Sequence, residues 1–297
     1  MFASIERGQR LDNSVMVLGY VIMRVALVSQ WLRAAKQDPA RRGCCLTYAV
    51  TISIAQLGWV ALIFAHLSAA GSIVLGAILV LIEFAGPVLA ERRDGGTPWH
   101  AHHIVERHSL FAIIALGEGV VGTVAALSAV VEQQSWSLDA ALVGIAGTGL
   151  TFGMWWIYYM VPAAEVLERH RDRAFAWGYI QMLIVTAIVA TGAGLHVAAY
   201  FIERRTAIGP VATVLSVAIP VAAYIGLNYA IYYYLVRRFY RLDVWLQTAI
   251  ATVLVASVVA AQSGIDVAKS LVILILAPAV IVVGYEGRGY RYEASGT

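Results

Sequence analysis

Charged residues are scarce in this chain of 297 residues. Asp, Glu, Lys and Arg together make up 13% of it, against roughly 25% in soluble domains. Hydrophobic residues make up 60%. A soluble protein would have to bury nearly all of its long, almost charge-free runs at once, which their number and length do not allow. The composition therefore excludes a soluble enzyme or binding domain and indicates a membrane protein.

Cysteines and catalytic motifs are also lacking. The only two cysteines, Cys44 and Cys45, are adjacent, and the charge distribution described below places them in the reducing cytoplasm, so no disulfide framework is expected. The sequence has no glycine-rich phosphate loop followed by Lys and Ser or Thr, and no Gly-x-Ser-x-Gly elbow. We therefore expect no enzyme activity, no cofactor and no metal site.

Long apolar runs take up most of the chain. A helix needs about 20 mainly apolar residues to cross a bilayer, and nine segments reach this length. They lie near residues 14–32, 46–66, 71–90, 109–131, 136–160, 174–200, 208–235, 244–262 and 268–285. The predicted fold is all-α, a polytopic bundle of about nine transmembrane helices that forms one integral membrane domain over residues 1–297.

Lys and Arg are concentrated in alternate loops. The basic loops comprise residues 33–42, 92–107, 169–173 and 237–241. The opposite side carries far fewer, namely Arg204, Arg205 and Lys269, with Arg7 and Arg10 ahead of the first run. Because basic loops stay in the cytoplasm, the pattern predicts a multi-pass inner-membrane protein with a cytoplasmic C-terminus. Nine spans then place the N-terminus outside, although residues 1–13 contain no signal peptide. Helices upstream of Met1 would explain this, and we expect them.

The most distinctive stretch is H-x-x-H-I-V-E-R-x-x-L-F-x-I-I-x-L-G-E, from His100 to Glu118. Together with L-G-Y-V-I-M-R-V-A-L-V (18–28) and W-W-I-Y-Y (155–159), it resembles the bacterial low temperature requirement protein A family. The motif residues are His100, His103, Glu106, Arg107, Gly117 and Glu118. The chain departs from the family pattern at His108, Ser109 and Gln181, and we expect the family's opening helices to be missing from it. The resemblance implies an integral membrane protein linked by name to growth in the cold, without a settled reaction or substrate.

Three charged residues lie well inside apolar runs: Arg24, Glu83 and Glu118. At about 1.5 Å per helical residue, each lies roughly 12–15 Å from the cytoplasmic face, so they share one depth. Charges at one depth on different helices can pair, which lowers the cost of burying them. We predict an Arg24–Glu118 pair with Glu83 nearby. Two interpretations stay open, a proton- or ion-responsive site and a purely structural ion pair that fixes helix register.

Pro87 lies four residues after Glu83 and cannot donate a backbone hydrogen bond to the Glu83 carbonyl. It predicts a kink beside the intramembrane carboxylate. The freed carbonyl could help to coordinate a cation, as broken helices do in transporters. The alternative is an ordinary membrane-helix proline whose carbonyl is satisfied by neighbours, and this structural interpretation is favoured.

The histidines near the fourth run have a helical spacing, because His100, His103 and Glu106 follow one another at intervals of three. Imidazole and carboxylate groups suit zinc or iron, and clustered histidines can also relay protons. The H-E-x-x-H zinc signature is absent, however. We expect interfacial histidines that face lipid headgroups, and a Glu106–Arg107 pair that caps the helix from its N-terminal end.

Small residues form packing stripes in two of the runs. Gly119 and Gly122 lie beside Glu118, and Gly149 and Gly153 have the spacing that allows close helix approach. We expect them to bring a neighbouring helix close to Glu118.

Two classes of function remain open. The first is a transporter or channel for a small solute or ion, and the second is a membrane scaffold or sensor that supports growth in the cold. The expected partners are the lipid bilayer and, for the first class, an unidentified solute or ion; a homo-oligomer is compatible with the sequence. The net charge of +3 comes from loop arginines that set topology, so no nucleic-acid partner is expected.

Overall fold

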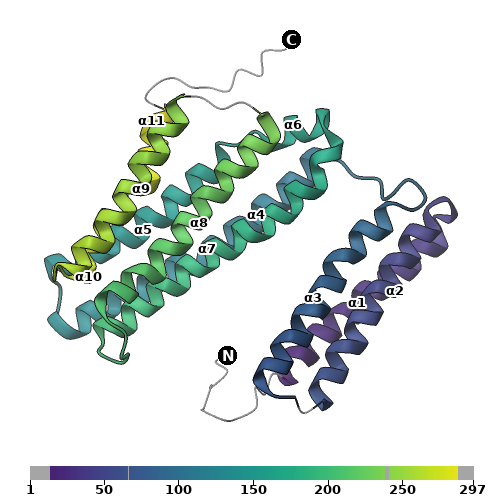
Figure 1. Ribbon diagram of the computed structural model, residues 1–297, viewed down its shortest axis with the longest axis horizontal. Coiled ribbons are helices and arrows are strands. Elements are labelled where there is room, and N and C mark those ends of the chain that lie inside the picture. Colours follow the sequence, from purple (N-terminus) through teal and green to yellow (C-terminus); the bar gives the residue numbers. More distant parts are fainter. Residues whose placement is uncertain (1–13, 66, 238–240, 287–297) are drawn as a thin grey trace. The chain divides into compact units, whose positions relative to one another are not determined.

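The computed structural model describes residues 14–65, 67–237 and 241–286, which form helices and short loops with no strand among them (Figure 1). Nine stretches of this described part are long and apolar enough to cross a membrane. The all-α polytopic prediction is therefore confirmed. The α-helices are α1 (Ser14–Gln37), α2 (Arg42–Phe64), α3 (Ala69–Glu91), α4 (Ala101–Gln134), α5 (Leu138–Tyr159), α6 (Ala163–Arg169), α7 (Ala174–Ile202), α8 (Pro210–Val236), α9 (Arg241–Gln262), α10 (Val267–Leu274) and α11 (Leu276–Glu286), and the 3-10 helices are η1 (Pro39–Arg41) and η2 (Arg171–Arg173).

The chain divides into two compact units, Met1–Trp99 and His100–Thr297. Helices α1 to α3 belong to the first unit, and α4 to α11 belong to the second. The single membrane domain stays a prediction.

In the first unit, α2 packs against both α1 and α3. Small residues allow α2 and α3 to approach closely, because Gly58 of α2 faces Leu79, and Gly86 of α3 faces Thr51. At one end of the pair, the Tyr48 hydroxyl donates a hydrogen bond of 2.8 Å to the Glu91 carboxylate. These contacts fix the register of α2 against α3.

The second unit is built on the pairs α4–α7, α7–α8 and α4–α5. Its core contains the fully buried side chains of Trp177 and Tyr224. The Tyr224 hydroxyl donates to the Met154 carbonyl of α5 at 2.5 Å, so the buried hydroxyl group has a partner. Gly149 and Gly153 allow a close approach, as their spacing predicts: Gly149 faces Ile275 at the junction of α10 and α11, and Gly153 faces Pro278 of α11.

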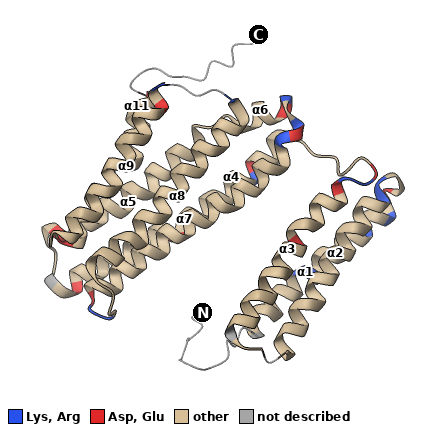
Figure 2. Ribbon diagram, in the orientation of Figure 1, with Lys and Arg blue, Asp and Glu red and all other residues tan. Residues whose placement is uncertain are grey.

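Both units carry large exposed apolar side chains on their outer faces. Ile22 of α1 and Ile114 of α4 are each 73% exposed, and Leu57 of α2 is 71% exposed. Contiguous exposure of this kind is unfavourable in water and suits the hydrocarbon of a bilayer. Charged residues lie mainly at the helix ends (Figure 2). The chain is an integral membrane protein.

Helix α4 begins earlier than predicted, at Ala101 instead of residue 109. The apolar run marks only the part of a helix that lies in hydrocarbon, whereas the helix itself continues into polar sequence. His100 is the N-cap residue, and the first turn of α4 contains no acidic residue. Glu106 lies beyond that first turn, so the prediction that it caps the helix was wrong.

The ninth predicted span corresponds to one apolar stretch, Val267–Glu286, within which α10 and α11 meet at Ile275. Pro278 explains the junction, because it has no N–H to donate to the Leu274 carbonyl four residues earlier. Pro87, in contrast, lies inside the continuous helix α3. The predicted kink at Pro87 and its role in cation coordination stay predictions.

Candidate functional site

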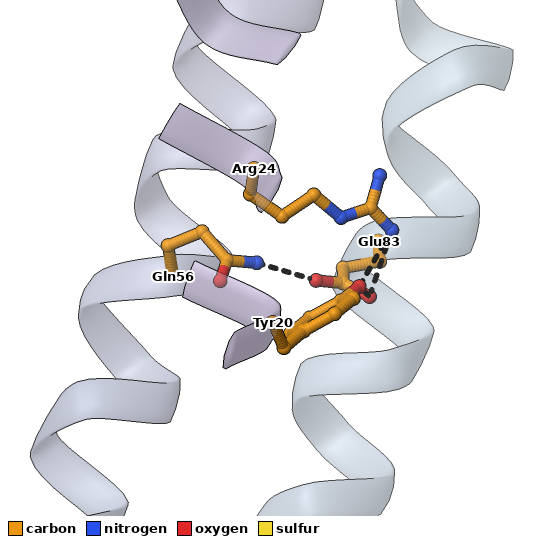
Figure 3. A network of polar contacts seen from close by, with 4 residues as sticks. All are labelled: Tyr20, Arg24, Gln56 and Glu83. Atoms are coloured by element: carbon orange, nitrogen blue, oxygen red, sulfur yellow. Dashed lines mark hydrogen bonds and ion pairs between the residues drawn. The ribbon is translucent and has the colours of Figure 1, made fainter. Parts of the chain in front are cut away.

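A polar network joins the three helices of the first unit within their apolar stretches (Figure 3). Tyr20 and Arg24 project from α1, Gln56 from α2 and Glu83 from α3 toward one another. The Tyr20 hydroxyl donates to one Glu83 oxygen at 2.6 Å, and the Gln56 amide donates to the other oxygen at 2.9 Å. Both carboxylate oxygens therefore have donors from neighbouring helices.

Arg24 approaches the same carboxylate through Tyr20. Its Nη2 donates to the Tyr20 hydroxyl at 2.5 Å and lies 3.8 Å from Glu83 Oε2. The guanidinium carbon also lies 4.8 Å from the centre of the Tyr20 ring, within cation–π range. A cation and an anion that share one hydroxyl compensate each other, which lowers the cost of placing both charges among apolar helices.

The network is not fully satisfied. Arg24 Nε, Gln56 Oε1 and the indole N–H of Trp59 are buried without a hydrogen-bond partner in the described part of the chain. The Trp59 ring packs edge-on against Tyr20, so its N–H belongs to the same surroundings. Two donors and one acceptor beside the Arg24–Glu83 pair are thus free to contact a further polar group. Leaving their hydrogen bonds unmade costs free energy.

A second intramembrane pair lies in the second unit. Glu118 Oε1 of α4 is 3.4 Å from His196 Nε2 of α7. Two glycines bring these helices together: a Cβ atom added at Gly192 would lie 2.6 Å from the Glu118 carbonyl carbon, and one added at Gly122 would lie 2.5 Å from the Gly192 carbonyl oxygen. The small-residue stripe beside Glu118 is therefore a packing surface, as predicted.

The predicted charge site is thus distributed over two places. The structure brings Arg24 and Glu83 together in the first unit, with Pro87 one turn after Glu83. Glu118 belongs to the second unit, where it faces His196. The predicted Arg24–Glu118 pair would join the two units and stays a prediction.

The residues of the His100–Glu118 motif do not form one cluster. His102 Nε2 lies 3.5 Å from Glu168 of α6, and the His108 ring packs edge-on against Trp177 of α7. His103, Glu106 and Arg107 are exposed. Gly117, unlike Gly119, has open space where a Cβ would lie.

The ionisable side chains of residues 14–65, 67–237 and 241–286 are too dispersed for a metal centre. Among these residues, no group of three His, Cys, Asp or Glu side chains is arranged to hold a metal ion.

Three residues of these sites were not predicted from the sequence: Tyr20, Gln56 and His196. Tyr20 lies four residues before Arg24, so both are on one helix face, and this spacing was a usable signal. His196 is an ionisable residue in a long apolar run, which should have marked it as a candidate. Gln56 had no such signal, because only the packing of α2 against α3 brings its amide to Glu83.

The sequence that carries these contacts matches a known protein family. A family model described as bacterial low temperature requirement A protein (LtrA) matches residues 1–278. No curated protein and no solved structure matches the chain. Since the matched residues include both intramembrane pairs and nearly the whole chain, the protein belongs to the bacterial low temperature requirement A (LtrA) family.

Proposed function

We propose that the protein conducts protons or another small ion, or a small solute, across the membrane, and that Arg24, Glu83 and Glu118 are the charged residues that take part. The Tyr20–Arg24–Gln56–Glu83 network is the observation that carries this proposal, because it combines an ion pair with free donors and acceptors inside apolar helices. Ionisable side chains at such depth are costly and are usually retained for function.

The chemistry of the network links ion binding to helix contacts. A proton or cation that binds Glu83 competes with the attraction of Arg24 and with the donors of Tyr20 and Gln56. Occupancy of the carboxylate would therefore weaken the contacts that join α1 and α2 to α3. A ligand that binds two helix arrangements with different affinity shifts the balance between them, which is the requirement for coupled transport.

The Glu118–His196 pair supplies a second proton acceptor. A carboxylate and an imidazole 3.4 Å apart can share one proton, and His is the side chain best suited to exchange it near neutral pH. The two side chains are 41% and 29% exposed, respectively, so neither is fully enclosed by the helices of the second unit. In the second unit, Glu118 and His196 are therefore the proposed proton-exchanging residues.

The test is a flux measurement on the full chain in proteoliposomes that contain a pH-sensitive dye. Under an imposed pH gradient, Glu118→Gln should lower the proton flux at least tenfold, because the amide cannot take up the proton. The matched control is Glu132→Gln, an exposed carboxylate on the same helix α4, which should leave the flux unchanged. If Glu118→Gln keeps both its fold and the wild-type flux, Glu118 is not part of the path.

A non-transporting scaffold or sensor is the second candidate, and one observation favours it. The Arg24 and Glu83 charges compensate each other and, through Tyr20 and Gln56, tie three helices together. A purely structural pair predicts that substitutions alter stability alone, without any flux to lose.

We also propose that the protein lies in the bacterial inner membrane with its C-terminus in the cytoplasm. Within each unit, basic segments gather at one end (Figure 2). In the first unit, the Gly43 N–H donates to Asp94 at 2.6 Å and joins the basic α1–α2 connection to the end of α3. In the second, the Tyr285–Asp243 hydrogen bond holds the end of α11 beside the start of α9.

The orientation predicts opposite outcomes for two fusions at the C-terminus. A fluorescent protein that folds only in the cytoplasm should be fluorescent there, and alkaline phosphatase, which needs the oxidising periplasm, should be inactive. The same two reporters inserted after Arg205, in a loop on the opposite side, are the control and should give the reverse pattern. An active phosphatase at the C-terminus would invert the proposed topology.

A further inference from the structure

A small basic cavity lies at one end of the second unit, away from Glu118 and His196. It has a volume of about 150 Å³ and lies between α6, η2 and the last turn of α8. Its ionisable lining residues are Arg169, His170, Arg173, Arg237 and Glu165. The lining thus contains three arginines and a histidine against one carboxylate, so its positive charge favours an anion.

Arg173 is held in place by the end of α8. Its Nη1 donates to the Leu235 carbonyl, one of the carbonyls that the last turn of a helix leaves unpaired. This bond fixes the guanidinium plane at the cavity wall. The Nε–H of the same group is buried and has no partner in the described part of the chain. A buried guanidinium N–H without an acceptor is costly, so Arg173 keeps an unused donor beside the cavity.

Arg237 contributes from the other side. It ends α8 in the left-handed conformation, with φ of 54°, and its N–H bonds to the Tyr233 carbonyl. This conformation is uncommon for a residue with a side chain, and it turns the chain at the rim of the cavity. The exposed side chains of Arg169 and Arg237 can therefore approach the same anion from α6 and from α8.

We propose that this cavity binds a phosphate-bearing anion. Guanidinium groups present paired N–H donors that match the oxygens of phosphate, and several of them around one cavity can bind more than one oxygen of the same group. Two sources have this chemistry, the headgroup of an anionic phospholipid and free phosphate. The cavity lies at the basic end of the unit, where headgroups and aqueous phosphate are both within reach, and basic pockets between membrane helices bind anionic headgroups.

The experiment compares two arginine variants with a matched control in the purified full chain. Arg169→Gln and Arg237→Asn each remove one cation from the rim, and asparagine tolerates the left-handed backbone of Arg237. The control is Arg204→Asn. Arg204 is also exposed and left-handed, with φ of 57°, but it follows the C-terminal end of α7, whereas the cavity lies near the N-terminal end of that helix. Glu165→Gln removes the single acid and should strengthen binding, an effect that no misfolded variant would give.

In the first arm, inorganic phosphate is titrated at constant ionic strength while the unfolding temperature is followed. In the second arm, the protein is reconstituted into nanodiscs of phosphatidylglycerol or phosphatidylcholine and then released from them. The number of lipid molecules that stay bound to it is measured by native mass spectrometry. Each rim variant should weaken binding about tenfold, and Glu165→Gln should strengthen it about threefold. A response in the first arm alone identifies free phosphate as the ligand, and selective retention of phosphatidylglycerol identifies a headgroup. No response in either arm, or an equal loss in Arg204→Asn, would overturn the proposal.

Discussion

Gly192→Ala, a change on α7, is expected to destabilise the protein by forcing α7 away from α4. The added methyl group would lie 2.6 Å from the carbonyl carbon of Glu118 and 2.8 Å from its carbonyl oxygen. Backbone atoms cannot turn away as a side chain can, so α4 and α7 would have to separate. Overpacking of this kind costs about 1–3 kcal/mol, and leucine at the same position should cost more.

The measurement is the free energy of unfolding in mixed micelles as the fraction of denaturing detergent increases, with helicity as the signal. Gly178→Ala on the same helix is the matched control, because a Cβ there would have no atom within 4 Å. It should be neutral or stabilising, since alanine is the better helix former. Equal stability of Gly192→Ala and Gly178→Ala would show that α4 and α7 do not approach as closely as the structure has them.

The two halves of the Arg24–Glu83 pair are expected to respond unequally to substitution. When Arg24 is replaced by glutamine, Glu83 keeps the Tyr20 and Gln56 donors and can take up a proton to become neutral. When Glu83 is replaced by glutamine, Arg24 remains a buried cation that cannot lose its proton. Breaking a buried pair costs about 3–5 kcal/mol, and we expect Glu83→Gln to approach this value and Arg24→Gln to cost about half as much.

The double variant Arg24→Gln/Glu83→Gln distinguishes the two functional candidates. With both charges removed, the remaining amide and hydroxyl groups can still bond to one another, so stability should return to within about 1 kcal/mol of wild type. Under the transport proposal, the double variant should fold and yet lack flux. If it recovers stability and flux together, the pair is structural. If the two single variants are equally destabilised, the difference in neutralisation between Glu83 and Arg24 is not what governs the cost.

Most of the fold could be predicted, because apolar length alone decides which segments can span a bilayer. Where the helices differ from the apolar runs, the reason is local. Helix α4 starts at Ala101, because a helix does not end where its apolar surface ends. Within the last span, α10 and α11 meet at Ile275, because a single proline interrupts an otherwise uniform apolar run. A hydropathy pattern predicts neither the polar extension of α4 nor the α10–α11 junction, because it reflects side-chain polarity and not backbone hydrogen bonding.

The site was less predictable than the fold, for a reason that lies in geometry. Arg24 and Glu83 could be selected as intramembrane charges, but depth along a helix does not say which way a side chain points. Which groups meet depends on the rotation of each helix, and that is set by close approaches such as Gly58 against Leu79. Glu118 illustrates the limit: its partner in the second unit, His196, lies on α7, and only the close packing of α4 against α7 brings the two side chains together.

The length of α4 has a consequence for where its carboxylate lies in a bilayer. Its 34 residues extend about 51 Å at 1.5 Å per residue, against roughly 30 Å of hydrocarbon. Such a mismatch is relieved by tilting or by polar ends that reach into the headgroups, and α4 has polar residues at both ends. Glu118 lies about 3 Å from the middle of the apolar stretch 109–131. A rod that tilts about its middle changes the depth of its ends and not of its centre, so Glu118 would remain near the midplane in thick and thin membranes alike.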